Sequence, residues 1–286
     1  GIRPLDLAQR LVDASRPLRA LALDIDGTLI DSRKQIMPFT RSEVHRVVEE
    51  SGLHLILVTA RSPQSAGVIE DRLGLPASYA TYGGSLVWAR QPDGSLLPLS
   101  ETPLHEEDVA FILETARAYD VHLGVYTRDS WYVSALDYWG LREARGTAVW
   151  PELIGADLPR PLFKIMFRGE PKPLADLAIA LAKRPGSTYA HHVRNVLEIV
   201  NSDAVKLTAL TKLAGHLDIG LDQMIAFGDS AADLGMLEHV GVGVLMGNAS
   251  ADLVISDRVE RTLSNDEDGI GMSLRKHFPT AEPFLP

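Results

Sequence analysis

Residues 18–32, LRALALDIDGTLIDS, decide the fold, because an apolar run ends there directly in two carboxylates, Asp24 and Asp26. A strand that is apolar on both faces is typical of the centre of a parallel sheet, where helices cover each side. Carboxylates are costly to bury without partners. Either these aspartates belong to an ordinary turn, or a positively charged group binds between them.

Strands and helices alternate around this first strand. A helix is expected at residues 40–51 and a second apolar strand at residues 53–60. Ser62 before Pro63 predicts the start of another helix, since serine is a good N-cap and proline suits the first helical position. A third strand is expected over residues 78–88. The alternation predicts an α/β fold with a doubly wound, mostly parallel sheet.

A different pattern occupies the middle of the chain. It begins with a predicted hairpin at Asp93-Gly94 and continues with a pair of strands around Arg128-Asp129. A Pro-rich connection then leads to a strand, a helix and more strand. This mixture is an α+β module of ordinary domain size.

The alternation of strands and helices resumes after Asp203, and the last expected strand covers residues 253–256. We therefore expect a core domain made of residues 1–85 and 201–286. An α+β cap domain, residues 86–200, would be inserted between its two halves.

Polar residues follow the expected core strands or begin the helices after them. They are Asp24, Asp26, Thr59, Lys206, Asp229 and Asp233. In a parallel sheet such positions meet at the carboxyl edge, so Asp24, Asp26 and Asp229 should converge. Each residue alone is more often a turn, a cap or a solvated side chain, but their occurrence in order favours a functional site.

Three carboxylates in one crevice repel each other unless a cation neutralises them. An all-oxygen cluster without His or Cys suits Mg²⁺, which usually shares a phosphate of its substrate. Lys206 and the hydroxyl of Thr59 would then bind that phosphate. Gly27 lets the backbone leave the strand sharply, so that the amides after Asp24 face a phosphoryl oxygen.

At these points the sequence resembles the haloacid dehalogenase superfamily. DIDGT is similar to its nucleophile loop, LVTAR to its second motif, Lys206 to its third, and GDSAAD to its acidic fourth. A module inserted between the second and third motifs resembles the type IIB subgroup, which includes Cof-like phosphatases. The resemblance covers nearly all of the chain from Leu18 onward and implies a core of that family with an inserted cap.

The resemblance implies a role for each matching residue. Asp24 would attack phosphorus and form an aspartyl-phosphate, and Asp26 would act as general acid and then as general base. The expected Mg²⁺ ligands are Asp24, the backbone carbonyl of Asp26, and Asp229, with Asp233 in support. The expected phosphate-binding groups are Thr59, Lys206 and the amides near Ile25 and Ala60.

Three positions depart from the subgroup's pattern. Ala232 stands where the subgroup commonly has an Asn that reaches the phosphate, Leu207 where a Gly follows the lysine, and Gly83 where an Asn is frequent. The missing Asn predicts weaker phosphate binding or a narrower substrate range.

The composition excludes several classes of function. A formal charge of −10 argues against binding nucleic-acid backbones or anionic membranes in general, and the absence of cysteine excludes disulfides and thiol chemistry. An amphipathic helix expected at residues 5–14 does not resemble a signal peptide, and no apolar segment approaches the roughly 20 residues of a membrane span. We expect a cytoplasmic protein whose partner is a small phosphorylated metabolite. Its oligomeric state is left open.

Three functions stay open at this point. The first is a Mg²⁺-dependent phosphatase acting on a sugar phosphate or a phosphorylated cofactor. The second is a sugar phosphomutase, which would need a site for two phosphates. The third is a non-catalytic sensor of a phosphorylated ligand, motivated by Ala232 and Leu207.

The cap would exclude water and select the substrate. Its polar candidates are Arg128, Asp129, Arg145, His191, His192, Arg194 and Glu198. Its aromatic residues Trp131, Tyr132, Tyr138 and Trp139 are expected in the domain core rather than as a platform for sugar stacking.

Overall fold

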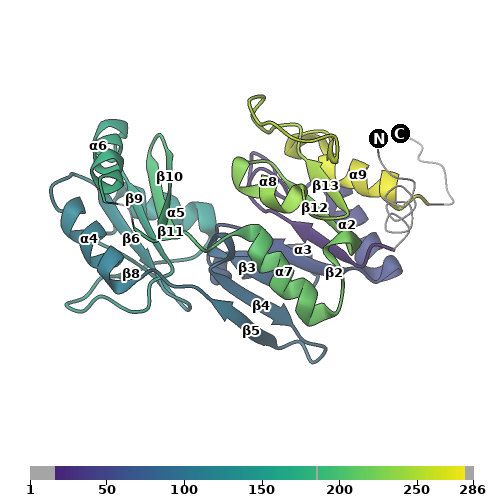
Figure 1. Ribbon diagram of the computed structural model, residues 1–286, viewed down its shortest axis with the longest axis horizontal. Coiled ribbons are helices and arrows are strands. Elements are labelled where there is room, and N and C mark those ends of the chain that lie inside the picture. The colour runs from purple at the N-terminus through teal and green to yellow at the C-terminus, as the bar shows by residue number, and fades with distance from the viewer. Residues whose placement is uncertain (1–16, 185, 281–286) are drawn as a thin grey trace, which may run out of the picture.

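The computed structural model describes residues 17–184 and 186–280, which form two lobes with a β-sheet each (Figure 1). An eight-stranded sheet has the order β14-β13-β12-β1-β2-β3-β4-β5, and a six-stranded sheet has the order β10-β11-β9-β6-β7-β8. The expected helix at residues 5–14 lies outside the described residues. No helix in the described part of the chain combines the length and apolar character needed to cross a bilayer.

The first strand, β1 (Ala20–Leu23), lies in the middle of the larger sheet. It pairs in parallel with β12 (Met224–Gly228) on one side and with β2 (His54–Val58) on the other. All four of its residues are buried, and alternate side chains enter two separate hydrophobic clusters. The prediction of a strand that is covered on both faces is confirmed.

Helices cover both faces of this sheet, as predicted for a doubly wound fold. One face packs against α2 (Pro38–Ser51), α3 (Pro63–Leu73) and α9 (Gly269–His277), and the other against α7 (Lys206–Leu217) and α8 (Ala231–Leu237). The helix α9 was not expected. Both sets of helices hold the polar ends of the central strands at one edge of the sheet.

The predicted start of α3 is confirmed. The side chain of Ser62 accepts a hydrogen bond from the amide of Ser65, and Pro63 occupies the first turn. This arrangement satisfies one of the free amides at the beginning of the helix.

The prediction of a single strand over residues 78–88 was wrong. The chain forms β3 (Ser78–Thr81), a short 3₁₀ turn (Tyr82–Gly84) and β4 (Leu86–Arg90), which returns antiparallel to β3. All three turn residues have positive φ, from 50° at Tyr82 to 111° at Gly84. Glycine tolerates such angles, so the Gly-Gly pair permits a reversal inside an otherwise continuous apolar run.

The predicted hairpin at Asp93-Gly94 joins β4 to β5 (Leu96–Glu101). Both strands belong to the eight-stranded sheet, although the expected boundary at residue 86 places them in the cap. The physical reason is the reversal before β4, which adds the hairpin to the edge of the core sheet. We therefore propose residues 102–201 as the inserted cap.

The cap packs two helices against one face of its sheet. Its hydrophobic cluster joins α4 (Glu106–Ala116) and α6 (Pro171–Ala182) to the central strands. The six strands are β6 (His122–Tyr126), β7 (Trp131–Val133), β8 (Glu152–Leu153), β9 (Lys164–Arg168), β10 (Thr188–Val193) and β11 (Val196–Asn201).

Two further expectations need correction. The supposed Pro-rich connection contains a helix, α5 (Tyr138–Thr147), whose first amides are bonded by the side chain of Asp137. Residues 253–256 form no strand, and the last strand is β14 (Val259–Arg261), which pairs with β13 (Val242–Leu245). A serine directly after an apolar triplet does not distinguish a loop from a strand.

Candidate active site

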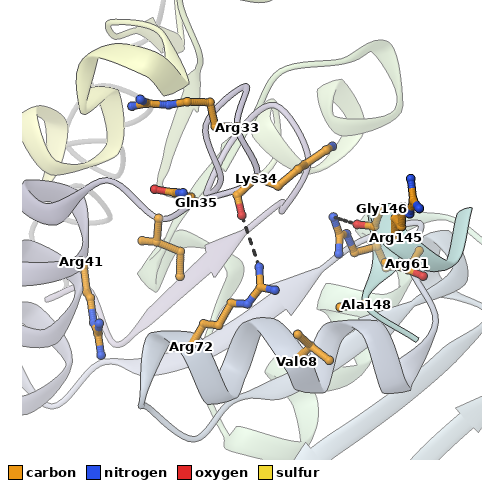
Figure 2. Close-up of a pocket in the computed structure, with 12 residues that line it drawn as sticks. Arg33, Lys34, Gln35, Arg41, Arg61, Val68, Arg72, Arg145, Gly146 and Ala148 are labelled. Atoms are coloured by element: carbon orange, nitrogen blue, oxygen red, sulfur yellow. Dashed lines mark hydrogen bonds between the residues drawn. The ribbon is translucent and has the colours of Figure 1, made fainter. Parts of the chain in front are cut away.

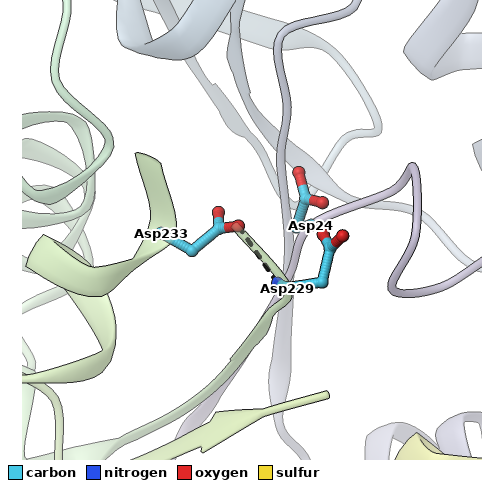
Figure 3. A group of neighbouring side chains, drawn as sticks. All are labelled: Asp24, Asp229 and Asp233. Carbon is cyan, nitrogen blue, oxygen red and sulfur yellow. Dashed lines mark hydrogen bonds between the residues drawn. The ribbon is translucent and has the colours of Figure 1, made fainter. Parts of the chain in front are cut away.

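A cluster of carboxylates lies where two neighbouring parallel strands end. Asp24 follows β1 and Asp229 follows β12, while Asp233 lies in the first turn of α8. One oxygen of each carboxylate lies within 4.8 Å of the others (Figure 3). The register of β1 with β12 thus brings together residues from opposite ends of the chain.

Asp233 is held in place by the capping box of α8, in which Ser230 is the N-cap and Asp233 the third helical residue. Its Oδ2 accepts hydrogen bonds from the amides of Asp229 at 3.1 Å and Ser230 at 3.0 Å, and from Oγ of Ser230 at 2.8 Å. Its side chain is fully buried. The hydroxyl of Thr28 donates to Oδ1 of Asp229 at 3.1 Å, which fixes a second member of the cluster.

Lys206 is the first residue of α7 and supplies the positive charge of the cluster. Its Nζ lies 2.7 Å from Oδ1 of Asp24 and 2.6 Å from Oδ1 of Asp233. All three side chains are buried. The two partners Asp24 and Lys206 are separated by 182 residues of sequence.

Burial shapes the electrostatics of this cluster. It raises the pKa of Asp24, an effect that Lys206 opposes and that Asp233 and Asp229 increase. Burial and the neighbouring Asp233 likewise raise the pKa of Asp229. Burial lowers the pKa of Lys206, but the charges of Asp24 and Asp233 outweigh it, so the net shift is upward.

The donor set fits a divalent cation. Three ionised carboxylates and one ammonium leave the cluster with a net charge of −2. Its donors are all oxygen, which hard cations such as Mg²⁺ prefer. No donor among the described residues bonds to the backbone carbonyl of Asp26, so this oxygen is also available.

The side chain of Asp26 does not join the cluster. It accepts hydrogen bonds from Arg61, Nε to Oδ2 at 2.6 Å and Nη2 to Oδ1 at 2.9 Å, and from Nζ of Lys34 at 2.8 Å. Burial raises the pKa of Asp26, but Arg61 and then Lys34 outweigh it and lower the pKa to about 2. Of the three carboxylates expected to converge, only Asp24 and Asp229 do so.

Apart from Lys206, the expected phosphate-binding groups lie in the loops after β1 and β2. Thr59 is buried, and its Oγ1 accepts a hydrogen bond from the amide of Arg61 at 3.1 Å. Within the described chain the amides of Ile25 and Ala60 donate to no acceptor. The side chain of Ile25 belongs to the hydrophobic core, so only its backbone can bind a ligand.

The departures from the subgroup's pattern also have a place in the structure. Ala232 is exposed in the first turn of α8, next to Asp233. The predicted loss of phosphate affinity at this position stays a prediction. Leu207, the second residue of α7, is partly exposed, and a Cβ added at Gly235 would lie 3.9 Å from its Cβ.

Nearly all of the described core and cap matches a known family of enzymes. A family model of haloacid dehalogenase-like hydrolases matches residues 21–274. The chain belongs to the haloacid dehalogenase-like hydrolases. The resemblance inferred from the four motifs is thereby confirmed, and so, at the level of the family, is the predicted class of enzyme.

Relatives of this hydrolase cover most of its length. A putative phosphatase of Haemophilus influenzae is 28% identical over 265 residues, covering 91% of this chain and 98% of its own. The HMP-PP phosphatase of Yersinia enterocolitica is 30% identical over 239 residues, covering 82% of this chain and 86% of its own.

A solved haloacid dehalogenase-like hydrolase from Bacteroides thetaiotaomicron shares the fold. It superposes with a TM-score of 0.80 at 24% identity, covering 91% of this chain and all of that one. Another neighbour, described as a subclass IIB sugar phosphatase, has a TM-score of 0.73 at 19% identity, covering 91% of this chain and 98% of its own. The predicted core with an inserted cap is confirmed at the level of the fold.

The hydrolase has a pocket of about 420 Å³ between the core loops and the cap. One buried cation of this pocket, Lys164, was not predicted from the sequence. Its Nζ lies 3.0 Å from Oε1 of Glu198 and 3.3 Å from the carbonyl of Ala60. The ammonium also lies 4.4 Å from the ring centre of Tyr126. A lysine inside the apolar strand PLFKIMF was the signal that could have revealed it.

The cap candidates from the sequence lie in several different places. Glu198 lines this pocket together with Trp131, which is buried as expected, whereas Tyr138, also expected in the domain core, is 65% exposed. Arg128 is instead paired with Glu101 on the core side. His191 and His192 of the edge strand β10, and Arg194 directly after it, are exposed and do not line this pocket.

Proposed function

We propose that this hydrolase is a Mg²⁺-dependent phosphatase that cleaves a small phosphorylated metabolite through an aspartyl-phosphate on Asp24. The observation that carries the proposal is the position of Asp24, buried at the end of the central strand between Lys206 and two further carboxylates. A buried carboxylate beside a cation and a vacant pair of amides is suited to attack an anionic phosphoryl group.

Mg²⁺ would be held by Asp24, Asp229 and the backbone carbonyl of Asp26. Asp233 would support it indirectly, because this residue bonds the amide of Asp229 and the ammonium of Lys206. The ion would neutralise charge on the phosphoryl oxygens and on the cluster.

The chain's own donors would hold the phosphoryl group. Lys206 supplies a cation, Thr59 a hydroxyl, and Ile25 and Ala60 their free amides. Such donors, fixed by strand ends and helix caps, stabilise the charge of the transition state without reorganising.

The reaction proceeds in two displacements. An oxygen of Asp24 bonds to phosphorus, the bond from phosphorus to the leaving alcohol oxygen breaks, and Asp26 gives that oxygen a proton. Asp26 then takes a proton from water, whose oxygen attacks phosphorus and releases Asp24 and inorganic phosphate. Since Arg61 keeps Asp26 ionised in the present arrangement, the first step requires Asp26 to leave that arginine.

The metabolite would occupy the pocket lined by Lys164 and Glu198. Relatives support a small phosphorylated metabolite, since they include the HMP-PP phosphatase and a 5-amino-6-(5-phospho-D-ribitylamino)uracil phosphatase of Bacillus subtilis. A cytoplasmic location, predicted from the composition, belongs to this proposal.

The test measures phosphate release from a chromogenic aryl phosphate with and without Mg²⁺. Asp24→Asn should lose turnover by about 10³-fold or more, while Asp252→Asn, an exposed aspartate away from the cluster, should retain it. A panel of phosphorylated metabolites then identifies the substrate. Silence of the wild type on the ester and on the whole panel would overturn the proposal.

The same panel separates the other two functions. A phosphomutase would return labelled phosphate to a sugar instead of releasing it. A sensor would bind a phosphorylated ligand without turnover, and Ala232→Asn would then be the first variant to examine for restored activity.

A further inference from the structure

A second pocket, of about 460 Å³, lies beside the active site and is lined by an unusual set of side chains (Figure 2). Lys and Arg make up 28 of the 286 residues of the chain, yet six of the twelve residues lining this pocket. The lining includes no aspartate or glutamate. We call it the arginine pocket; its cations are Arg33, Lys34, Arg41, Arg61, Arg72 and Arg145.

Three of these cations have no carboxylate partner within residues 17–184 and 186–280. Arg41 of α2, Arg72 of α3 and Arg145 near the end of α5 form no ion pair with any described residue. In the described part of the chain, the guanidinium of Arg72 donates one hydrogen bond, to the backbone carbonyl of Lys34 at 3.3 Å. Although the chain carries 38 acidic residues, positive charge without a described carboxylate partner gathers in this pocket, which favours a locally positive potential.

The pocket is formed by both lobes. In Figure 2, Arg41 and Arg72 extend from the core helices α2 and α3, and Arg145 lies on the other side of the pocket, near the end of the cap helix α5. A ligand that bridges these side chains would therefore contact core and cap together.

The arginine pocket also adjoins the active site. Lys34 and Arg61 line both pockets, and both donate hydrogen bonds to Asp26. A ligand in the arginine pocket would therefore lie beside the proposed acid–base residue.

We propose that the arginine pocket binds a phosphate-type oxyanion, separate from the phosphoryl group that is cleaved at Asp24. Guanidinium groups offer paired donors that match phosphate oxygens, and the volume is sufficient for an anionic portion of a metabolite. The anion is either a second phosphate of the substrate itself or a free phosphate compound. Binding does not depend on the proposed function, whereas the assignment to the substrate rests on it.

The first arm measures binding of inorganic pyrophosphate to metal-free protein by calorimetry in a chelating buffer. Without metal the carboxylate cluster carries net negative charge and repels anions, so the signal reports the arginine pocket. We expect one pyrophosphate per wild-type chain and at least about tenfold weaker binding in the Arg72→Gln, Arg145→Gln double variant.

A matched control removes the same two positive charges elsewhere. Arg117→Gln with Lys172→Gln changes exposed residues of the cap and should bind like wild type. Circular dichroism checks that both double variants fold. The proposal would be overturned if the wild type did not bind pyrophosphate, or if the Arg72→Gln, Arg145→Gln variant bound it as tightly as the wild type. It would also be overturned if the control variant lost as much affinity as that variant.

The second arm identifies the source of the anion by comparing a hexose 6-phosphate with the hexose 1,6-bisphosphate. If the substrate supplies it, the Arg72→Gln, Arg145→Gln variant raises KM about tenfold or more for the bisphosphate alone. If the anion is instead a free phosphate compound, the variant has an unchanged KM for both esters. Pyrophosphate then alters kcat in the wild type but not in the variant, at constant free Mg²⁺. No hydrolysis together with intact pyrophosphate binding would overturn the proposed function and leave this site standing.

Discussion

Arg61 holds Asp26 through two hydrogen bonds, from Nε to Oδ2 at 2.6 Å and from Nη2 to Oδ1 at 2.9 Å. The same guanidinium donates to Oγ of Ser65 at 2.9 Å, and that hydroxyl donates to the carbonyl of Thr147 in the cap at 3.0 Å. The proposed acid–base residue is thus linked to the cap through two core side chains. The main effect of losing Arg61 should therefore be a change in the proton affinity of Asp26.

Replacing Arg61 by glutamine should raise the pKa of Asp26. Burial already raises it, and Arg61 is the main group that brings it down to about 2. Without Arg61 we expect an increase of at least about one unit, toward the ordinary value of about 3.9. A carboxyl-carbon NMR titration measures this directly. Arg33→Gln, whose guanidinium pairs with Asp31 instead, should leave the titration of Asp26 unchanged.

Replacing Asp26 by asparagine should trap the covalent intermediate. A nitrophenyl phosphate has a good leaving group, so attack by Asp24 can proceed without a proton donor, while hydrolysis of the aspartyl-phosphate loses its base. We expect one equivalent of nitrophenol in a burst, followed by turnover about 10²–10⁴-fold slower than wild type. Rapid-mixing absorbance measures both phases. Slow turnover without a burst would remove Asp26 from the second step.

Mg²⁺ should stabilise the protein more at pH 7.5 than at pH 5. Burial raises the pKa values of Asp24 and Asp229, so protonation favours the metal-free fold at low pH and this contribution is lost as pH rises through those values. A bound cation replaces this stabilisation, because it neutralises the ionised carboxylates. We expect a rise in Tm of about 5 °C at saturating Mg²⁺ and pH 7.5.

Thermal unfolding in a chelator and in Mg²⁺ at both pH values checks this expectation. The Asp229→Asn variant is the comparison, since it removes one ligand and should shrink the difference. An equal Mg²⁺ effect at both pH values, or in both proteins, would show that the ion binds elsewhere.

Gly27→Ala should damage the site as well as the fold. The residue has φ of 76°, and an added Cβ would lie 2.3 Å from Oδ2 of Asp229. Gly52 makes a matched control, because it also has positive φ, 67°, but an added Cβ meets nothing within 4 Å. Both variants should lose about 1–2 kcal/mol of unfolding free energy, and only Gly27→Ala should also lose Mg²⁺ affinity and kcat. Calorimetry and kinetics of the pair separate strain from displacement of Asp229.

Glu43→Gln should weaken the contact between α2 and α9. Glu43 accepts hydrogen bonds from Arg46 of its own helix and from Arg275 of α9. Burial raises its pKa, but the two arginines outweigh this and lower it, so its contribution is present above the unfolded pKa of about 4.3 and is lost as pH falls through the folded value.

We expect Glu43→Gln to cost about 2–3 kcal/mol of unfolding free energy at pH 7. The cost should shrink steadily below pH 4, which denaturant titrations over pH measure. Glu114→Gln, in an exposed pair with Arg117, should cost no more than about 0.5 kcal/mol at any pH. A pH-independent cost at Glu43 would indicate lost packing instead of lost charge.

The central part of the fold was predictable because its sequence signals are local. The apolar run before Asp24 and the Ser62-Pro63 pair each specify an element by themselves. The reversal at Gly83 was not predictable from hydrophobicity, since apolar residues continue across it. The helix α5 was missed because its sequence, YWGLREARGT, includes two glycines, which lower helix propensity, although Asp137 before it is a favourable N-cap.

The positions of site residues that directly follow strand ends could be predicted. The hydrogen-bond partners of long side chains could not. Backbone register alone brings Asp24 beside Asp229. The turn of Asp26 toward Arg61 depends on side-chain conformation, and the position of Lys164 depends on how the cap meets the core. Neither relationship leaves a periodic pattern in the sequence.

The separation of Asp24 from Lys206 has a consequence for synthesis of the chain. A nascent polypeptide exposes β1 with its carboxylates long before residues 206–233 leave the ribosome, and β1 lacks its neighbour β12 throughout that time. The cap, residues 102–201, is continuous and has its own hydrophobic cluster, so it has all of its strands before the larger sheet does. The proposed active site is therefore completed only after the cap, and a ribosome-stalled chain ending before Asp233 would carry a complete cap beside an incomplete site.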